Sequence, residues 1–255
     1  MIKSFFLLLL LLLNSIFVVA QSKEREVVDQ TIEWFAVTSS IKVDKHVNLL
    51  AEGQFRFVNH FEPMQFQART AVEVVLNKSF SIVPLGYVYT WNPIYGEQPA
   101  TYSNNEHRIW EQVTYKHKVS RFNISHRIRL EQRYIQVHSN SNGEIINHGY
   151  DMHTNRLRYR FLSNIPLNRD KMEAKTIYAC VYDEIFMSWG KPVTYHEPDQ
   201  NRIFAGLGYQ INSKVSFQTG FFRQMLIKSN GAKQENNSGF QAQLTYNVDL
   251  TKESN

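Results

Sequence analysis

The stretch from Arg121 to Tyr134, RFNISHRIRLEQRY, alternates in polarity from one residue to the next. Its odd-numbered positions are all polar and its even-numbered positions are mostly apolar. A period of two is the pattern of a β-strand with one wet face and one apolar face, whereas a helix would spread the arginines around its circumference. Its 14 residues would extend about 46 Å at roughly 3.3 Å each, beyond the usual length of a soluble strand. Since a transmembrane strand needs only about 9–11 residues, this stretch is long enough to cross a membrane.

The same alternation recurs along the chain, and its clearest example runs from Ser238 to Leu250. We count 11 such stretches, and the connections between them alternate in length. Short connections fall at Asp44, Asn77, Lys118, Pro166 and Asn212, and most of the longer ones fall at Asn92, His138, Gly190 and Lys228. Short periplasmic turns and longer external loops are typical of outer-membrane barrels, which in bacteria normally have an even number of strands. The sequence therefore predicts an all-β, antiparallel up-and-down transmembrane β-barrel of about 10–12 strands, with 12 favoured. Either Glu24 to Ile32 hides one more strand, or one of the long stretches is really two strands or none.

The N-terminus has the features of a secretory signal peptide. Lys3 supplies a positive charge, Phe5 to Leu13 is unbroken apolar sequence, and Val18-Val19-Ala20 resembles a cleavage site. We predict a signal peptide at residues 1–20 and an outer-membrane barrel domain at residues 21–255; an uncleaved membrane anchor is the alternative. No later stretch approaches the roughly 18 consecutive apolar residues of a transmembrane helix.

Composition narrows the class further. The single cysteine, Cys180, excludes an intramolecular disulfide and a cysteine-based zinc site. The formal net charge of +5 comes from basic residues spread among the strands, so nucleic acid is not an expected partner. Aromatic residues make up 13% of the chain, which fits aromatic girdles at two membrane interfaces but also fits other β-rich proteins.

Four segments, in their order and spacing, resemble the DUF2490 family of uncharacterised bacterial proteins, common in Bacteroidetes and presumed to be outer-membrane β-barrels. They are Arg108–Gln112, His126–Arg133, Arg156–Phe161 and Tyr182–Phe186. The resemblance implies a fold and a location in the outer membrane, with membrane lipid and the barrel-assembly machinery as partners. It implies no activity, substrate, cofactor or catalytic residue. In one departure, the chain ends at Asn255 without the terminal aromatic residue by which the assembly machinery reads many outer-membrane strands.

The candidate site is a set of charged side chains that the alternation directs into the lumen. Its members are Arg127, Arg129, Glu131, Arg133, Arg156, Arg158, Arg160 and Glu184. A ring of arginines in a narrow pore could select small anionic solutes. Alternatively, arginines and glutamates, Glu73 included, could pair across the lumen and brace the barrel. We favour the bracing interpretation, because polar interiors are general in such barrels.

Two other functional classes stay open. An outer-membrane lipid-modifying enzyme would need a serine and a histidine together at one rim. Ser125 and His126 are adjacent in the sequence and so face opposite sides of a strand, and we find no catalytic motif and assign no catalytic or metal-binding residue. A soluble periplasmic β-barrel that binds a small ligand would instead turn its apolar residues inward and its arginines outward.

Overall fold

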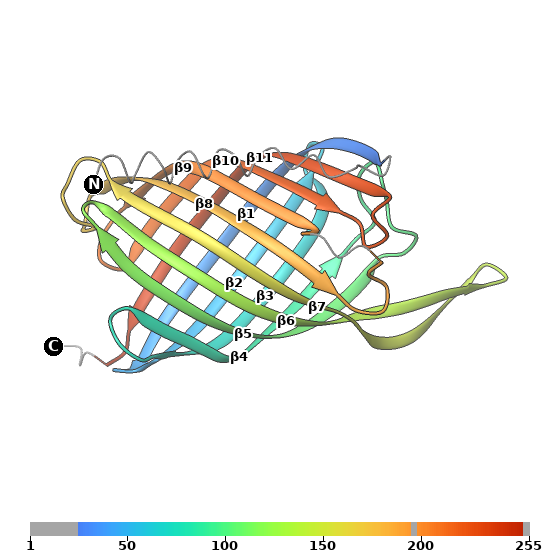
Figure 1. Ribbon diagram of the computed structural model, residues 1–255, viewed down its shortest axis with the longest axis horizontal. Helices are drawn as coiled ribbons and strands as arrows, with labels where there is room; N and C mark the ends of the chain where they lie inside the picture. The colour runs from blue at the N-terminus through green and yellow to red at the C-terminus, as the bar shows by residue number, and fades with distance from the viewer. Residues whose placement is uncertain (1–24, 195–197, 252–255) are drawn as a thin grey trace, which may run out of the picture.

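The computed structural model describes residues 25–194 and 198–251, which form a closed barrel of eleven strands (Figure 1). The predicted signal peptide lies outside the described residues. The strands are β1 (Glu26–Asp44), β2 (Val47–Val58), β3 (Glu62–Val75), β4 (Phe80–Asn92), β5 (Asn104–Val119), β6 (Phe122–Ser141), β7 (Glu144–Pro166), β8 (Thr176–Trp189), β9 (Gln200–Gln210), β10 (Val215–Ile227) and β11 (Lys233–Asp249). The described part of the chain contains no helix long and apolar enough to span a membrane.

The all-β barrel is confirmed, and its strand count of eleven is one below the favoured 12. The polar residues before Glu33 do not form a strand of their own, because they extend β1 back to Glu26. Consecutive strands are antiparallel, so an odd number leaves the first and last strands running in the same direction. The barrel accordingly closes through a parallel ladder from Glu26–Lys233 to Lys42–Asp249, which corrects the expectation of a purely antiparallel sheet.

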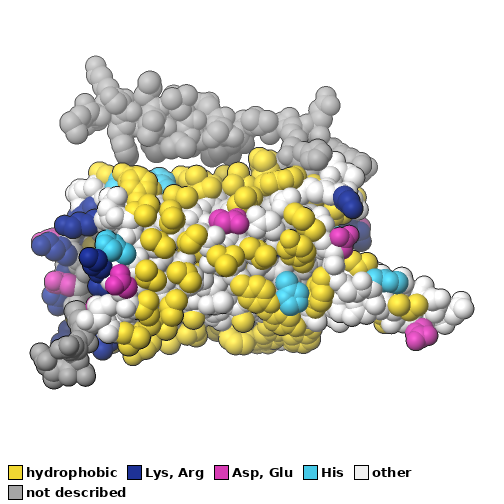
Figure 2. Space-filling view, turned by 90° about the horizontal axis from the view of Figure 1, so that it is seen from below, with side chains coloured by type: hydrophobic (Ala, Val, Ile, Leu, Met, Phe, Trp, Pro, Cys, Tyr) yellow, Lys and Arg dark blue, Asp and Glu magenta, His cyan; other side chains and the backbone are white. Residues whose placement is uncertain are grey.

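Apolar side chains cover the outer wall, and arginines fill the inside. Leu157, Phe240 and Leu244 are each 40% exposed, whereas Arg127 and Arg158 are 9% and 5% exposed. Figure 2 shows the apolar side chains spread over the wall between the two ends of the barrel. This arrangement is opposite to that of a soluble barrel with an apolar ligand cavity, in which the apolar face would point inward.

The two ends of the barrel carry different connections. We call the end with the connections at residues 45–46, 76–79, 120–121, 167–175 and 211–214 the turn mouth. We call the other end, with the connections at 59–61, 93–103, 142–143, 190–199 and 228–232, the loop mouth. The predicted asymmetry is therefore present in part, since the two longest connections lie at the loop mouth, but the expected short turn at Pro166 is a nine-residue connection.

The loop expected between His138 and Asn147 is instead a projecting β-hairpin. Strands β6 and β7 continue past the barrel wall to a two-residue turn at Asn142 and Gly143 (Figure 1). Both turn residues have positive φ, 52° and 91°, which is the backbone of a type I′ turn and the reason an Asn-Gly pair suits it. A hairpin that projects beyond the wall has no face to bury, so its strands are mostly polar on both faces. They therefore lack the alternation by which the other strands are recognised in the sequence.

Close packing at the closing ladder depends on Gly239 of β11. A Cβ atom added there would lie 1.9 Å from the carbonyl oxygen of Ile32 on β1, so any side chain must push the two strands apart. Gly53 on β2 has more room around it, because a Cβ atom added there would contact only Phe55, at 3.9 Å.

We predict that Gly239→Val destabilises the barrel by about 3 kcal/mol, because the overlap is with backbone that cannot rotate away. The measurement is the temperature at which the folded, fast-migrating band is lost in heat-modifiable electrophoresis. Gly53→Val serves as the matched control and should melt with the wild type. Equal melting of the two variants would show that the parallel seam tolerates separation.

Candidate functional site

Two glutamates hold the predicted arginines together at the middle of the lumen. Glu131 of β6 is fully buried and forms ion pairs with Arg156, at 2.8 Å, and with Arg158 of β7. Glu184 of β8 pairs with Arg158, at 2.8 Å, and with Arg127 of β6. Arg158 thus lies between the two carboxylates and donates hydrogen bonds to both. The network joins three neighbouring strands across the inside of the wall.

A third glutamate extends this network toward the loop mouth. Glu106 of β5 is 1% exposed and accepts hydrogen bonds from Arg108 and from the predicted Arg133. Arg108 also lies 3.8 Å from Glu131, and Arg202 of β9 lies 4.0 Å from Glu184. We did not single out these three residues from the sequence. The alternation along β5 could have identified Arg108 and Glu106, because both occupy even-numbered positions and so face the same side of the strand as Trp110.

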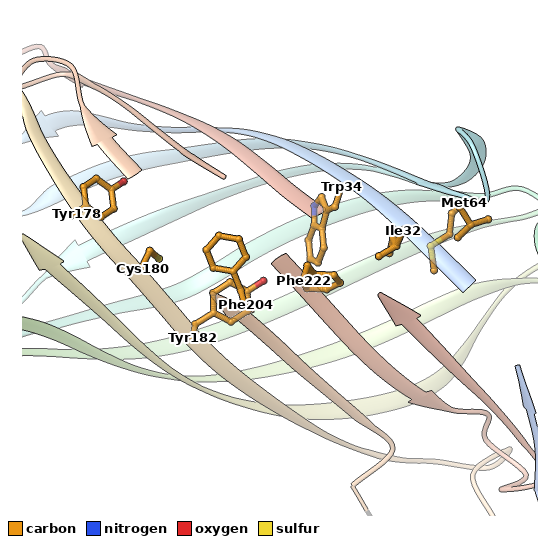
Figure 3. Packing of buried hydrophobic residues seen from close by; sticks show 9 residues of the cluster. Ile32, Trp34, Met64, Tyr178, Cys180, Tyr182, Phe204 and Phe222 are labelled. Atoms are coloured by element: carbon orange, nitrogen blue, oxygen red, sulfur yellow. The ribbon is translucent and has the colours of Figure 1, made fainter. Parts of the chain in front are cut away.

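Aromatic rings complete the packing from the opposite side of the lumen. Trp34 of β1 contacts Phe222 of β10 edge to face at 4.8 Å, and Tyr182 stacks on Phe204 at 5.3 Å. Figure 3 shows these rings inside the barrel, in a buried cluster that β1, β8, β9 and β10 help to form. Because a ring face is electron-rich, it is a favourable neighbour for a guanidinium group.

The arginines use these ring faces as well as the carboxylates. The guanidinium carbon of Arg56 lies 3.9 Å from the ring centroid of Trp34, and that of Arg129 lies 4.0 Å from Trp110. Arg158 and Arg202 both lie 4.6 Å from the ring of Phe186. Each stack covers one flat face of a buried cation whose hydrogen bonds lie at its edge.

Ion pairs and rings together form a septum across the barrel. We define the septum by its buried side chains Trp34, Arg56, Glu131, Arg158, Phe186 and Arg202. On one side lies a cavity of about 490 Å³ that reaches toward the turn mouth, and we call it the turn chamber. On the other side lies the loop chamber, of about 240 Å³. Arg56 and Arg202 line both chambers, so the two cavities meet at these side chains.

The connection at residues 93–103 folds over the loop mouth. Tyr95 lines the loop chamber and donates a hydrogen bond to Glu235 of β11 at 3.3 Å. Burial, and after it the charge of Glu235, raises the pKa of Tyr95, so the phenol stays protonated at neutral pH. The Nε2 group of Gln98 donates to the carbonyl of Glu26 at 3.0 Å, which ties the same connection to β1.

All eight predicted residues lie on the inner side of the barrel wall, and seven of them form ion pairs within the septum or beside it. Arg160 is the exception, because no described residue forms a hydrogen bond or an ion pair with it. Glu73 does not pair with an arginine as proposed; it accepts hydrogen bonds from Asn48 and Ser81. Glu52 takes a comparable role instead and pairs with Arg69 at 2.7 Å.

One serine and one histidine do come together, on the projecting hairpin. Ser139 Oγ and His148 Nε2 are 2.7 Å apart. Within the described residues, no carboxylate or amide forms a hydrogen bond with the other nitrogen of His148, so the group that would orient a catalytic base is missing from this pair. Ser125 and His126 face opposite sides of β6: Ser125 lines the turn chamber, and His126 stacks on Tyr115 and His117 of the outer wall.

One of three comparisons with known proteins gave a match. No similar curated protein and no similar solved structure was found for the chain. The family model described as "Protein of unknown function (DUF2490)" matches residues 32–236, from the middle of β1 into β11. The match covers most of the barrel and includes the charged septum, and the chain therefore belongs to the DUF2490 family.

Proposed function

We propose that this protein is an outer-membrane β-barrel with a structural role, and that its charged lumen braces the wall instead of conducting solutes. The observation that carries the proposal is the inversion of the faces, with apolar side chains outward and ion-paired arginines inward. An apolar outer wall needs lipid around it, and a closed ladder leaves no unpaired strand edge in the hydrocarbon.

The positions of aromatic side chains support a membrane-spanning wall. Near the loop mouth, Phe35, Phe55, Phe66 and Trp91 are paired in register across four strands. Near the turn mouth, a second row is formed by Phe80, Tyr115, His126 and Phe161. Interfacial aromatic girdles have this arrangement.

The spacing of the two rows matches the thickness of a membrane. Phe80 and Trp91 both belong to β4 and lie 11 residues apart, or about 36 Å along the strand at roughly 3.3 Å per residue. At a tilt of about 45° this length corresponds to about 26 Å along the barrel axis. The apolar band of outer-membrane barrels is about 25 Å tall, so the rows fall where the two interfaces would lie.

The first prediction tests the membrane position of the outer wall. Leu244 is the middle one of the outward apolar residues that run from Phe240 to Val248 on β11, and Leu250 lies just beyond the strand. We expect Leu244→Arg to cost about 2–4 kcal/mol of folding free energy in lipid vesicles, and Leu250→Arg about 0–1, because the cost depends on depth. Reversible urea unfolding in vesicles provides the measurement. Equal costs for the two variants, or recovery of the folded protein in the soluble periplasmic fraction, would contradict a membrane location.

The second prediction tests the brace. Glu131→Gln removes the carboxylate between Arg156 and Arg158, so the buried Arg156 loses its ion-pair partner and Arg158 keeps only Glu184. Breaking a buried pair in this way costs about 3–5 kcal/mol. The matched control is Glu173→Gln, which breaks the exposed Arg169–Glu173 pair at the turn mouth and should cost less than about 1 kcal/mol. A Glu131 variant as stable as the control would show that the septum does not brace the barrel.

The third prediction separates a brace from a channel. With the septum between the two chambers, the refolded protein in a planar lipid bilayer should carry no steady ionic current. The comparison is the variant with Arg127, Arg129 and Arg158 replaced by alanine, which loses one ion-paired arginine of the septum and two that adjoin it and should leak. A steady current through the wild type, with an anion preference that this triple variant loses, would favour the small-channel role.

A further inference from the structure

We propose that the turn chamber is a binding site for a small water-soluble oxyanion, a solute that carries a phosphate or carboxylate group. The first observation is an excess of positive charge along the chamber wall, where every basic side chain except the exposed Lys116 is buried or half-buried. The chamber is lined by eight basic side chains, Arg56, Arg69, Lys116, Arg127, Arg129, Arg158, Arg160 and Arg202. Only three acidic side chains, Glu52, Glu73 and Glu184, line the same space. Buried cations without enough carboxylates need another anion, because unpaired charge in a low-dielectric interior is costly.

The second observation is a set of guanidinium nitrogens without hydrogen-bond partners. Buried nitrogens on Arg127 (Nε), Arg129 (Nη1) and Arg160 (Nε) have no acceptor among the described residues. Arg127 and Arg129 are 9% and 4% exposed, so bulk water does not compensate for them. Arg129 Nη1 has only a distant carboxylate, 3.8 Å away on Glu131. Each of these arginines therefore keeps one donor that the protein leaves unused, and charge-assisted hydrogen bonds from guanidinium groups to oxyanions are strong.

The register brings two of these arginines directly opposite each other. In the ladder between β6 and β7, Arg127 lies directly opposite Arg160, and Arg129 lies directly opposite Arg158 at the next inward position. Directly opposed side chains on neighbouring strands have Cβ atoms about 5 Å apart, and like charges in that position repel. Glu184 offsets Arg127 and Arg158, but Arg160 is left without a carboxylate within ion-pair distance. An oxyanion held between Arg127 and Arg160 would replace this repulsion with two attractions.

Access to the chamber is from the turn mouth. Lys116 and Asn247, which line it near this mouth, are exposed, whereas the septum residues Trp34, Arg56, Arg158 and Arg202 line its inner end. The connections at this mouth carry seven basic residues, namely Lys45, Lys78, Arg121, Arg169, Lys171, Lys175 and Lys214. They carry two acidic residues, Asp170 and Glu173. Figure 2 shows basic side chains gathered at the end of the barrel away from the projecting hairpin. Such a rim concentrates anions at the entrance.

The size of the chamber suits a small organic anion. Its volume of about 490 Å³ falls within the range of roughly 300–1,000 Å³ that is usual for small-molecule sites. Beyond the arginines its wall is mainly amide and hydroxyl groups, among them Gln112, Gln218 and Thr245. A mainly polar wall of this kind suits a hydrated solute.

Trp110 provides a built-in reporter for the experiment, because the guanidinium of Arg129 lies over its ring. We expect inorganic phosphate, added to the refolded protein in a non-ionic detergent at constant ionic strength, to change tryptophan fluorescence in a saturable way. It should also raise the melting temperature of the wild type, since a ligand that binds only the folded state stabilises that state. Chloride at the same ionic strength should do neither.

Arg160→Gln is the decisive variant, because Arg160 forms no ion pair whose loss could unfold the barrel. It should bind phosphate at least tenfold more weakly and, without phosphate, melt no lower than the wild type. Arg169→Gln is the matched control: it removes a basic side chain from the same rim and should bind as the wild type does. Phosphate binding that is unchanged in Arg160→Gln, equally reduced in both variants, or absent in the wild type would overturn the site. The assay is done in detergent, so its outcome does not depend on where the barrel resides.

Discussion

The pairing of buried guanidinium groups with three carboxylates is the constraint on which the interior depends. Glu106, Glu131 and Glu184 belong to β5, β6 and β8, and the arginines that they hold come from β5, β6, β7 and β9. Because buried cations are tolerated only where carboxylates or ring faces meet them, the strands must keep the register that brings these groups together. A shift of one residue would turn an entire strand's charges toward the outside. The ion pairs therefore specify the register of the basic half of the barrel.

Aromatic residues do the equivalent work on the other half of the lumen. Strands β8, β9, β10 and β1 contribute Tyr182, Phe204, Phe222 and Trp34, whose rings fill the space that arginine side chains leave. The interior of an eleven-stranded barrel is wider than a single layer of apolar side chains can fill. Long arginine side chains that reach inward and lie against aromatic rings fill the remaining space. Bracing and closure of the lumen are consequently two results of the same contacts.

The sequence predicted the wall well and the partners less well. Alternation placed Arg127, Arg129 and Arg158 on the inner wall, because side-chain direction in a strand is a local property. The partner of each arginine depends on which strand lies beside it and in what register, and no pattern within one strand contains that information. The sequence offered both Glu184, a member of the candidate site, and Glu73 as partners for the arginines, yet of the two only Glu184 pairs with them. The eleven strands lie within the predicted range, but the favoured count of 12 was one too high, because Glu26 to Ile32 is too polar to show whether it extends a strand or forms a new one.

The parallel seam has a consequence for the two ends of the barrel domain. Strand β1 begins at the loop mouth, and β11, which runs beside it in the same direction, finishes at the turn mouth. An even-stranded barrel would bring both ends out on one side. Here a peptide joined ahead of Glu26 and one joined after Asp249 would emerge at opposite mouths. If the barrel spans a bilayer, an affinity tag at one end and a second tag at the other would be reachable by antibody or protease from different compartments.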